Sequence, residues 1–233
     1  MYEYIFNADE CWYKDTCKYY GSEECNGACI RYMKMHYLAN NSLLTPLQQK
    51  PKSLNITRDY VDMQAYMELN NIKNNIVEFV NEGRNLVIHS EHTGNGKSLW
   101  STKLLMKYFD SIWHTDNFSV RGLFIEVSRF LFSAKYGSLT DLDYINHIKE
   151  NILTADLVVW DDIGIKDLSK AEHEYLFGFI NARINNGKSN IYTTNMSSDE
   201  FKRVMGDRLF SRVFVASRVI EFKAPDQRGN KQW

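Results

Sequence analysis

The stretch NLVIHSEHTGNGKSLW, residues 85–100, decides the fold. It opens with a short apolar run, NLVIHS (85–90), which is typical of a buried strand. The next eight residues, EHTGNGKS (91–98), match the phosphate-binding pattern G-x-x-x-x-G-K-[ST] except at the first position, where Glu91 replaces glycine. A helix is expected from about Lys97. A strand before the loop and a helix after it are the setting in which such a loop binds phosphate.

The residue types in this loop suit a nucleoside triphosphate. Successive backbone N–H groups must point inward to hold phosphate, and glycines at 94 and 96 permit that sterically. The start of the following helix adds partial positive charge. We expect Lys97 to contact the β- and γ-phosphates of ATP and Ser98 to hold Mg²⁺. The predicted nucleotide contacts are Thr93, Gly94, Asn95, Gly96, Lys97, Ser98 and Leu99. A chance Gly-rich loop is the alternative.

A second motif, LVVWDD (157–162), follows at the distance that P-loop enzymes use. An apolar strand that ends in acids places a carboxylate beside the Mg²⁺. We predict that Asp161 supports the metal and that Asp162 orients or deprotonates the attacking water. A strand followed by a solvated Asp-Asp turn is the alternative interpretation.

Two later signals are weaker when taken singly. Asn195 ends the apolar run NIYTTN (190–195), from which it could reach the γ-phosphate and the attacking water, although Asn also commonly begins turns. Arg208 and Arg212 are four residues apart in GDRLFSRVF, so on a helix they share one face. They are interpreted either as a solvated face or as arginines that reach the nucleotide of a neighbouring subunit.

Short apolar runs alternate with helical patterns along most of the chain. This alternation predicts an α/β fold with a mostly parallel sheet covered on both faces. Helices are predicted at 57–81, with a cap from Thr57 or Asp59, and at about 128–135, 141–152 and 168–186. The predicted strands are 85–90, 122–127, 155–162, 190–195 and 217–222.

All four cysteines lie within the first 29 residues, in the spacing C-x₅-C-x₇-C-x₃-C. Four thiolates suit the tetrahedral preference of Zn²⁺, and a closed Cys₄ shell is structural rather than catalytic. We therefore predict a zinc site at Cys11, Cys17, Cys25 and Cys29. His36 could replace one thiolate, an iron–sulfur cluster is a second interpretation, and four free thiols are a third.

The formal net charge of the 233 residues is −1, so any contact with nucleic acid must come from a local patch. No apolar run approaches the roughly 20 residues that span a bilayer. The first residues also lack the pattern of a secretory signal. The expected location is the cytoplasm, with no membrane partner.

Taken together and in order, the motifs TGNGKS, VVWDDIG, IYTTN and GDRLFSRV resemble the DnaC/DnaI-type replicative helicase loaders. These loaders are AAA+ ATPases related to the initiator DnaA and to IstB-type transposition ATPases. The resemblance covers about residues 57–228. It implies a P-loop AAA+ core without a helical lid domain, because only about twenty residues follow Arg212. It also implies three parts: a zinc-binding module at 1–40, a linker at 41–56 and the ATPase domain at 57–233.

The resemblance assigns roles to single residues. It makes Asn195 the sensor 1 residue, Arg212 an arginine finger and Arg208 its helper. Three positions depart from the family. Glu91 places an acid near the phosphates, Asp162 is shorter than the usual glutamate, and Arg228 is the sole weak candidate for sensor 2.

The resulting prediction is an ATPase that loads a DnaB-type replicative hexameric helicase onto single-stranded DNA, with ATP, Mg²⁺ and Zn²⁺ as cofactors. Self-association is expected through the ATPase domain, helicase binding through the aromatic-rich residues 1–45, and DNA contact at Lys135 and Tyr136. A short chain of this kind is often phage-encoded. The alternatives are an IstB-like or DnaA-like ATPase acting on duplex DNA, or an ATP-binding helicase adaptor or inhibitor.

Overall fold

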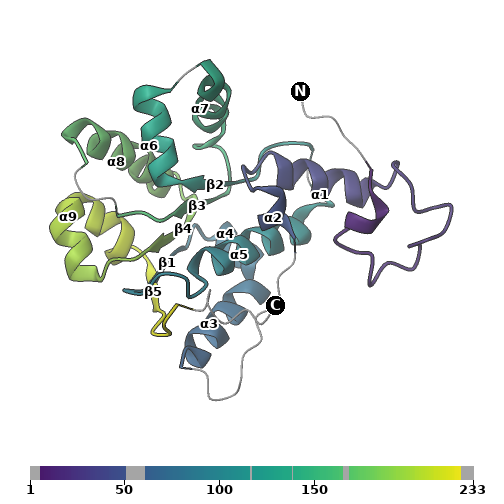
Figure 1. Cartoon of the computed structure of the whole chain (residues 1–233), viewed down its shortest axis with the longest axis horizontal. Helices are drawn as coiled ribbons and strands as arrows, with labels where there is room; N and C mark the ends of the chain where they lie inside the picture. The colour runs from purple at the N-terminus through teal and green to yellow at the C-terminus, as the bar shows by residue number, and fades with distance from the viewer. Residues whose placement is uncertain (1–5, 51–60, 116, 138, 165–167, 227–233) are drawn as a thin grey trace.

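The computed structural model describes residues 6–50, 61–115, 117–137, 139–164 and 168–226 (Figure 1). Two features of the sequence analysis lie outside these residues: the cap at Thr57 or Asp59, and the sensor 2 candidate Arg228.

The core is a five-stranded sheet in the order β2-β3-β4-β1-β5. Neighbouring strands all pair in parallel, with register pairs such as Val87↔Tyr192 and Val159↔Ile191. All five predicted strands are confirmed, with bounds shifted by one or two residues. The strands are β1 (Asn85–His89), β2 (Gly122–Glu126), β3 (Leu157–Asp161), β4 (Ser189–Thr194) and β5 (Arg218–Glu221).

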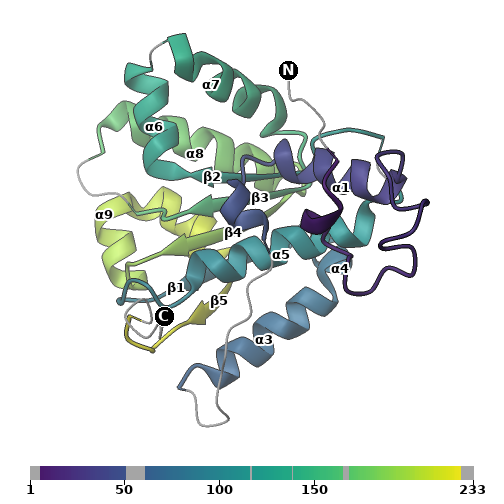
Figure 2. The ribbon, with the colours of Figure 1, turned by 45° about the vertical axis from the view of Figure 1, so that its right-hand side comes forward.

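Two helical layers enclose the sheet (Figure 2). Successive residues of a strand point to opposite faces, so Ile88 joins one apolar cluster and Val87 the other. The first cluster is covered by α1 (Ile30–Asn40), α3 (Met63–Asn74), α4 (Ile76–Asn81) and α5 (Lys97–Ile112). The second is covered by α6 (Val127–Tyr136), α7 (Leu139–Asn151), α8 (Lys170–Asn185), α9 (Ser198–Phe210) and the π-helical turn η2 (Ser211–Val215). The predicted α/β fold class is confirmed.

The single helix predicted at 57–81 is two helices in the described residues. Asn75 separates α3 from α4 with φ −112° and ψ 29°. Its side-chain amide donates to the carbonyl and the side-chain oxygen of Asn71, at 3.0 and 3.2 Å. Asn competes for backbone hydrogen bonds in this way and so interrupts helices. The apolar spacing continues across the break, which is why the periodicity alone predicted one helix.

The amino-terminal segment forms a 3₁₀ turn, η1 (Ala8–Glu10), a series of tight turns through residue 29, then α1 and the short α2 (Pro46–Gln49). The part of the predicted linker that the structure describes, residues 41–50, lies against the core. The carbonyl of Ser42 accepts from the N–H of Phe124 at 2.7 Å, on the outer side of the edge strand β2. The carbonyl of Asn41 accepts from His147 Nε2 at 2.8 Å. These contacts tie residues 41 and 42 to β2 and α7; the division of the chain into three parts stays a prediction.

In the described part of the chain β5 is the last element, and no lid helix follows it up to Asp226. The chain after β5 turns back toward α3 and the loop after β1. Both carboxylate oxygens of Asp62, just before α3, accept from the N–H groups of Lys223 (2.6 Å) and Ala224 (3.1 Å). The carbonyl of Ala224 in turn accepts from Asn95. Among the described helices, none has the length and apolar character needed to cross a membrane.

Candidate nucleotide-binding site

The loop between β1 and α5 has the backbone of a phosphate-binding loop. Gly94 and Gly96 have φ of 70° and 99°, in the left-handed region that other residues rarely adopt. Gly96 is the N-cap of α5, so the unpaired N–H groups of the first helical turn, from Lys97 onward, face the loop. This end of a 16-residue helix favours negative charge.

Side chains within the loop fix its shape. Asn95 is 1% exposed, and its amide donates to Ser90 Oγ at 2.5 Å and to the carbonyl of Ala224 at 3.3 Å. Lys97 is 8% exposed, and its Nζ donates to the carbonyl of His92 at 2.8 Å and to Asn95 Oδ1 at 3.3 Å. The lysine ammonium therefore lies folded against its own loop, beside the backbone N–H groups that would hold phosphate.

Asp161 ends β3 and lies next to the helix that begins after the loop. Its Oδ1 accepts from Thr193 Oγ1 at 2.6 Å, and its carboxylate also accepts from Ser98. Burial raises the pKa of Asp161, the two hydroxyl donors lower it, and the charge of Asp162 raises it again. A half-buried carboxylate beside a helix-start serine has the donor set that Mg²⁺ prefers, because both supply oxygen. Ser98 and Asp161 are thus brought together as the sequence predicted.

Asp162 and Asn195 form the next contact along the same edge of the sheet. Asp162 has φ 56°, a left-handed conformation that Asp tolerates better than most residues. Its N–H donates to Thr193 Oγ1 at 2.8 Å, and its Oδ1 accepts from Asn195 Nδ2 at 2.8 Å. The other amide atom, Asn195 Oδ1, is shielded from solvent and has no hydrogen-bond partner among the described residues. That oxygen can accept a hydrogen bond from a water molecule held between Asn195 and Asp162.

Sequence reasoning missed Thr193, which joins both acids. One hydroxyl donates to Asp161 and accepts from the N–H of Asp162, and the side chain is 1% exposed. Parallel pairing of β3 with β4 brings these residues together. The signal was present in the sequence: a threonine two residues before a strand-ending Asn, on a strand predicted beside the acidic one. Ser90, which holds Asn95, was missed in the same way.

The acid that replaces the first glycine of the motif lies on the surface. The Glu91 side chain is exposed, so water screens its charge. Its field still reaches His89 at the end of β1. Burial lowers the pKa of His89, and the charges of Glu221 and Glu91 oppose this change.

The model of one protein family, the IstB-like ATP-binding proteins, matches residues 64–223. The chain belongs to this family. The match spans the loop, both acids, Asn195 and both arginines, and it supports binding of ATP. A comparison with curated protein sequences gives no significant match.

Solved structures similar to this IstB-like chain include replication proteins. A crystal structure of the DnaC helicase loader has a TM-score of 0.58 and 21% identity, over 72% of this chain and 94% of that chain. A crystal structure of DnaI has a TM-score of 0.58 and 14% identity, over 80% and 95%. AMPPCP-bound DnaA from Aquifex aeolicus has a TM-score of 0.56 and 17% identity, over 75% and 51%. The AAA+ fold and the resemblance to the DnaC and DnaI loaders are therefore confirmed. At these identities the structural likeness concerns the fold alone.

Arg208 of α9 and Arg212 of η2 both pack against α8 in this IstB-like chain. Arg208 Nη1 contacts Glu174 Oε1 at 2.7 Å, and its guanidinium lies 4.0 Å from the ring centre of Phe177. Arg212 Nε donates to Asn181 Oδ1 at 2.8 Å. The α8 residues are three and four positions apart, so both guanidinium groups meet one face of that helix. The predicted shared face is present, although α9 has a kink at Gly206 and Arg212 follows it in the π-helical turn. Their roles stay predictions.

The four thiols of the IstB-like chain do not meet in a metal-binding group. Each cysteine is half-buried, and the described residues hold no cluster of three or more Cys, His, Asp or Glu side chains close enough for a metal ion. Burial is the largest cause that raises the pKa of Cys11, and the other three cysteines contribute. The His36 ring nitrogens face Asn40 Nδ2 at 2.9 and 3.0 Å. The donor set thus has the chemistry for zinc without the geometry, and zinc stays a prediction.

Proposed function

We propose that the chain is a Mg²⁺-dependent ATPase that loads a DnaB-type hexameric helicase onto single-stranded DNA. The observation that carries the proposal is the convergence of the loop lysine, the two acids and Asn195 at one edge of the sheet. Membership of an ATP-binding family and likeness to two helicase loaders support it.

The chemistry follows from these positions. Lys97 neutralises charge on the β- and γ-phosphates, and the loop N–H groups hold their oxygens. Ser98 and Asp161 would hold Mg²⁺, which when bound neutralises charge that develops on the phosphates. Asp162 accepts a proton from the attacking water, and Asn195 fixes that water through its unpartnered Oδ1. A steady-state ATPase assay tests this step: turnover that needs Mg²⁺ and Asp162 is expected. ATP binding without turnover would favour the adaptor alternative.

Self-association through the two arginines is part of the proposal. Arg208 and Arg212 have their described contacts on α8, so a second copy that packs against this surface would receive a guanidinium at its γ-phosphate. If a neighbouring subunit completes the active site, this explains why Arg208 and Arg212 are held side by side against α8.

The aromatic side chains at the amino terminus divide into two groups. Tyr32 is 3% exposed, and Trp12 packs on it with ring centres 5.8 Å apart, so these serve the core. Tyr19 and Tyr20 are 46% and 43% exposed. Aromatics at a surface tend to anchor protein interfaces. We therefore narrow the helicase contact from residues 1–45 to the surface around Tyr19 and Tyr20.

Size-exclusion chromatography with the DnaB-type helicase of the cell in which the protein works tests this contact. Tyr19→Ala/Tyr20→Ala is expected to lose co-elution, while the matched control Tyr136→Ala keeps it. A truncation between residues 45 and 50 is unsuitable, because it removes Met35, Leu38 and Leu44 from the core cluster. Co-elution of the double variant as tightly as the intact chain would contradict the assignment. Absence of any helicase complex, with tight binding of duplex DNA instead, would favour the IstB-like or DnaA-like alternative.

The proposal also includes a zinc ion bound by the four cysteines of the amino-terminal segment. Elemental analysis of protein purified without added metal is expected to find one zinc per chain. Iron with visible absorbance would indicate a cluster instead.

We add Phe132 to the proposed DNA contact on α6, which the sequence placed at Lys135 and Tyr136. Phe130 and Leu131 are buried, but Phe132 and Tyr136 are each 63% exposed, with ring centres 5.3 Å apart. Lys135 lies 5.0 Å from the Tyr136 ring centre and also pairs with Glu172 at 3.4 Å. Exposed rings beside a lysine suit stacked bases. Lys135→Ala/Tyr136→Ala is expected to weaken oligonucleotide binding, and unaltered affinity would exclude these residues.

A further inference from the structure

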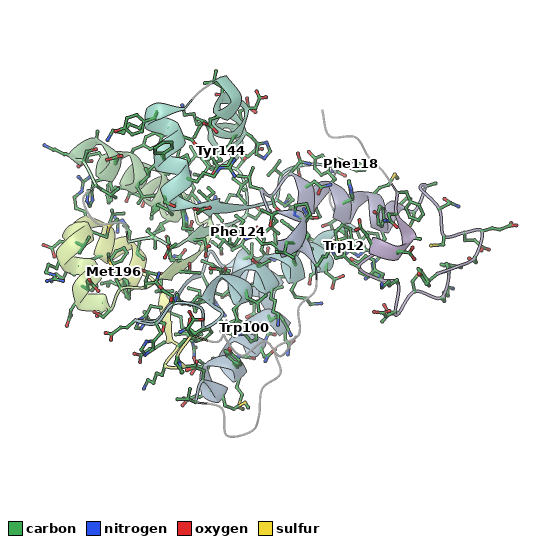
Figure 3. The ribbon with its side chains drawn as sticks, viewed as in Figure 1. Trp12, Trp100, Phe118, Phe124, Tyr144 and Met196 are labelled. Atoms are coloured by element: carbon green, nitrogen blue, oxygen red, sulfur yellow. The ribbon has the colours of Figure 1, made fainter. Side chains whose placement is uncertain are left out.

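A cavity of about 490 Å³ lies between the Cys-rich segment and the phosphate-loop helix. Of the predicted nucleotide contacts, Leu99 alone is among its lining residues. Its floor is the outer face of α5, from Leu99, directly after Ser98, to Asp110 near the other end of the helix. Trp12, labelled in Figure 3, belongs to its opposite wall. The remaining wall comes from α1, the end of α2 and the end of α3. The volume lies within the range of sites for small ligands, about 300–1,000 Å³.

The lining of this cavity is strongly cationic in a chain whose net charge is −1. Asp110 is its one acidic lining residue, and that carboxylate already accepts from Tyr13 OH at 3.0 Å and pairs with two cations. Five cations against one acid leave a formal charge of +4 on the described lining. The cationic residues are Arg31, Lys50, Lys73, Lys103 and Lys107.

Two of these lysines have no acidic partner among the described residues. Arg31 and Lys107 pair with Asp110 at 3.2 and 2.9 Å, and Lys50 pairs with Glu10 at 3.7 Å. Lys73 and Lys103 come from different helices, α3 and α5, and both are half-buried. Burial lowers the pKa of Lys103 first, and the positive charge of Lys73 lowers it further. Two repelling ammonium groups held together in a concave surface are stabilised when an anion lies between them.

We propose that this cavity binds a phosphate-bearing ligand of the nucleotide class between Lys73 and Lys103. The charge calls for an anion, and the compact ammonium groups suit phosphate oxygens. The aromatic residues Trp12 and Tyr13 in the wall offer apolar surface for a base or sugar. Two sources share this chemistry: a free nucleotide and one segment of a nucleic-acid strand. The site extends the proposed function without depending on it, because neither lysine belongs to the nucleotide site at the sheet edge.

The test is a titration of the full chain with two probes, thymidine monophosphate and a fluorescein-labelled oligothymidylate of 12 nucleotides. ATP and Mg²⁺ are present at one equivalent per chain, which fills the phosphate loop without an excess of nucleotide that would compete for the cavity. Lys73→Gln/Lys103→Gln is expected to weaken binding of at least one probe by tenfold or more. The matched control is Lys170→Gln/Lys202→Gln, which removes the same charge from exposed positions on α8 and α9 and is expected to bind as the unmodified chain does.

The two probes separate the sources. Binding of the monophosphate that depends on the two lysines identifies a free nucleotide. Lysine-dependent binding of the oligonucleotide alone identifies a strand. In that case the slope of log affinity against log salt falls by roughly 1.4 if each lysine contacts one phosphate. Circular dichroism and ATP binding check that the double variant is folded, and the two single variants replace it if it is not. Equal affinities of the lysine variants and the control for both probes would overturn the proposal.

Discussion

The nucleotide site and the Cys-rich segment are built in opposite ways. At the site, four parallel strand pairings and two helical layers bring Ser98, Asp161 and Asn195 to one edge of the sheet. In residues 6–29 the backbone hydrogen bonds join residues two to four positions apart, in successive turns. That segment meets the rest of the chain through a few side chains, such as Trp12 Nε1 to the carbonyl of Gln49 at 3.0 Å.

This difference in construction explains why sequence motifs predicted the nucleotide site better than the Cys-rich segment. A sheet edge places residues by register, so a motif on one strand predicts its neighbours on the next. A chain of turns has no register, so the spacing of its cysteines predicts chemistry but not geometry. Regular backbone and dense core contacts also resist local opening more than segments with few buried apolar contacts. Changes at the site should therefore alter function without unfolding, whereas changes in the Cys-rich segment should alter its docking.

The largest expected effect is on turnover in Arg212→Ala. This variant should bind ATP and lose hydrolysis by a factor on the order of 10³, since an arginine finger contributes at least that much. Mixing it with Lys97→Ala protein should restore part of the activity, because each variant supplies what the other lacks. Steady-state phosphate release measures both. Normal hydrolysis by Arg212→Ala would remove the finger assignment.

Lys97→Ala tests whether the loop between β1 and α5 binds the phosphates of ATP. Loss of the ammonium near the β- and γ-phosphates should weaken ATP binding more than tenfold, on the order of 1.4 kcal/mol or more. Isothermal titration in the presence of Mg²⁺ measures this change. Lys170→Ala, at an exposed position at the start of α8, is the matched control and should leave ATP affinity unchanged. Equal affinities of the two variants for ATP would contradict a phosphate-binding role for Lys97.

Thr193→Val tests the residue that joins the two acids. Valine keeps the shape and removes the hydroxyl that donates to Asp161, so the pKa of Asp161 should rise further above its ordinary value. The carboxylate must be ionised to hold Mg²⁺, so the acidic limb of the pH–rate profile should move to higher pH. The Mg²⁺ concentration for half-maximal turnover should rise by roughly tenfold, which corresponds to about 1.4 kcal/mol. Thr193→Ser should restore both. An unchanged profile in the valine variant would leave Thr193 a merely structural residue.

The smallest effect on nucleotide binding and turnover is expected from Tyr13→Phe, a change in the Cys-rich segment. Phenylalanine keeps the ring that stacks on Arg31, 3.3 Å from its centre, and loses the hydroxyl that donates to Asp110. A lost hydrogen bond to a charged group costs about 1.5 kcal/mol. Differential scanning calorimetry should show a Tm lower by roughly 3–6 °C, while ATP affinity stays the same. Tyr19→Phe, at an exposed position, is the control. A fall in ATP affinity would mean that the two regions are coupled.

The sequence predicted the sheet well because buried parallel strands are apolar runs with polar residues at their carboxyl ends, as in LVVWDD. It predicted the backbone of the phosphate loop because glycines with positive φ leave a signature; the contacts of this loop with a nucleotide stay predictions. It could not predict contacts that depend on distant pairing. Asp62 holds Lys223 and Ala224, which lie more than 160 residues later, and nothing in the local pattern around Asp62 points to them.

One departure from the family, Asp162, has a physical explanation that only the structure provides. Asp162 has the left-handed backbone in which Asp is tolerated better than Glu, so its shorter side chain suits its conformation. The amide of Asn195 reaches that shorter carboxylate directly. The prediction for residues 41–56 missed the pairing of Ser42 with β2, because polar, amide-rich composition is also what a segment along a sheet edge requires.

The two hydrogen bonds that hold the backbone of Ala224 have a mechanical consequence. Its N–H is held by Asp62 and its carbonyl by Asn95 of the phosphate loop, so a single peptide residue connects the carboxyl-terminal end of the chain to the nucleotide site. Tension on that end is transmitted to the loop over one residue rather than through the whole sheet. A surface tether or purification tag therefore belongs at the amino terminus. A pulling experiment from the carboxyl end would release bound nucleotide at a lower force than one from the opposite end.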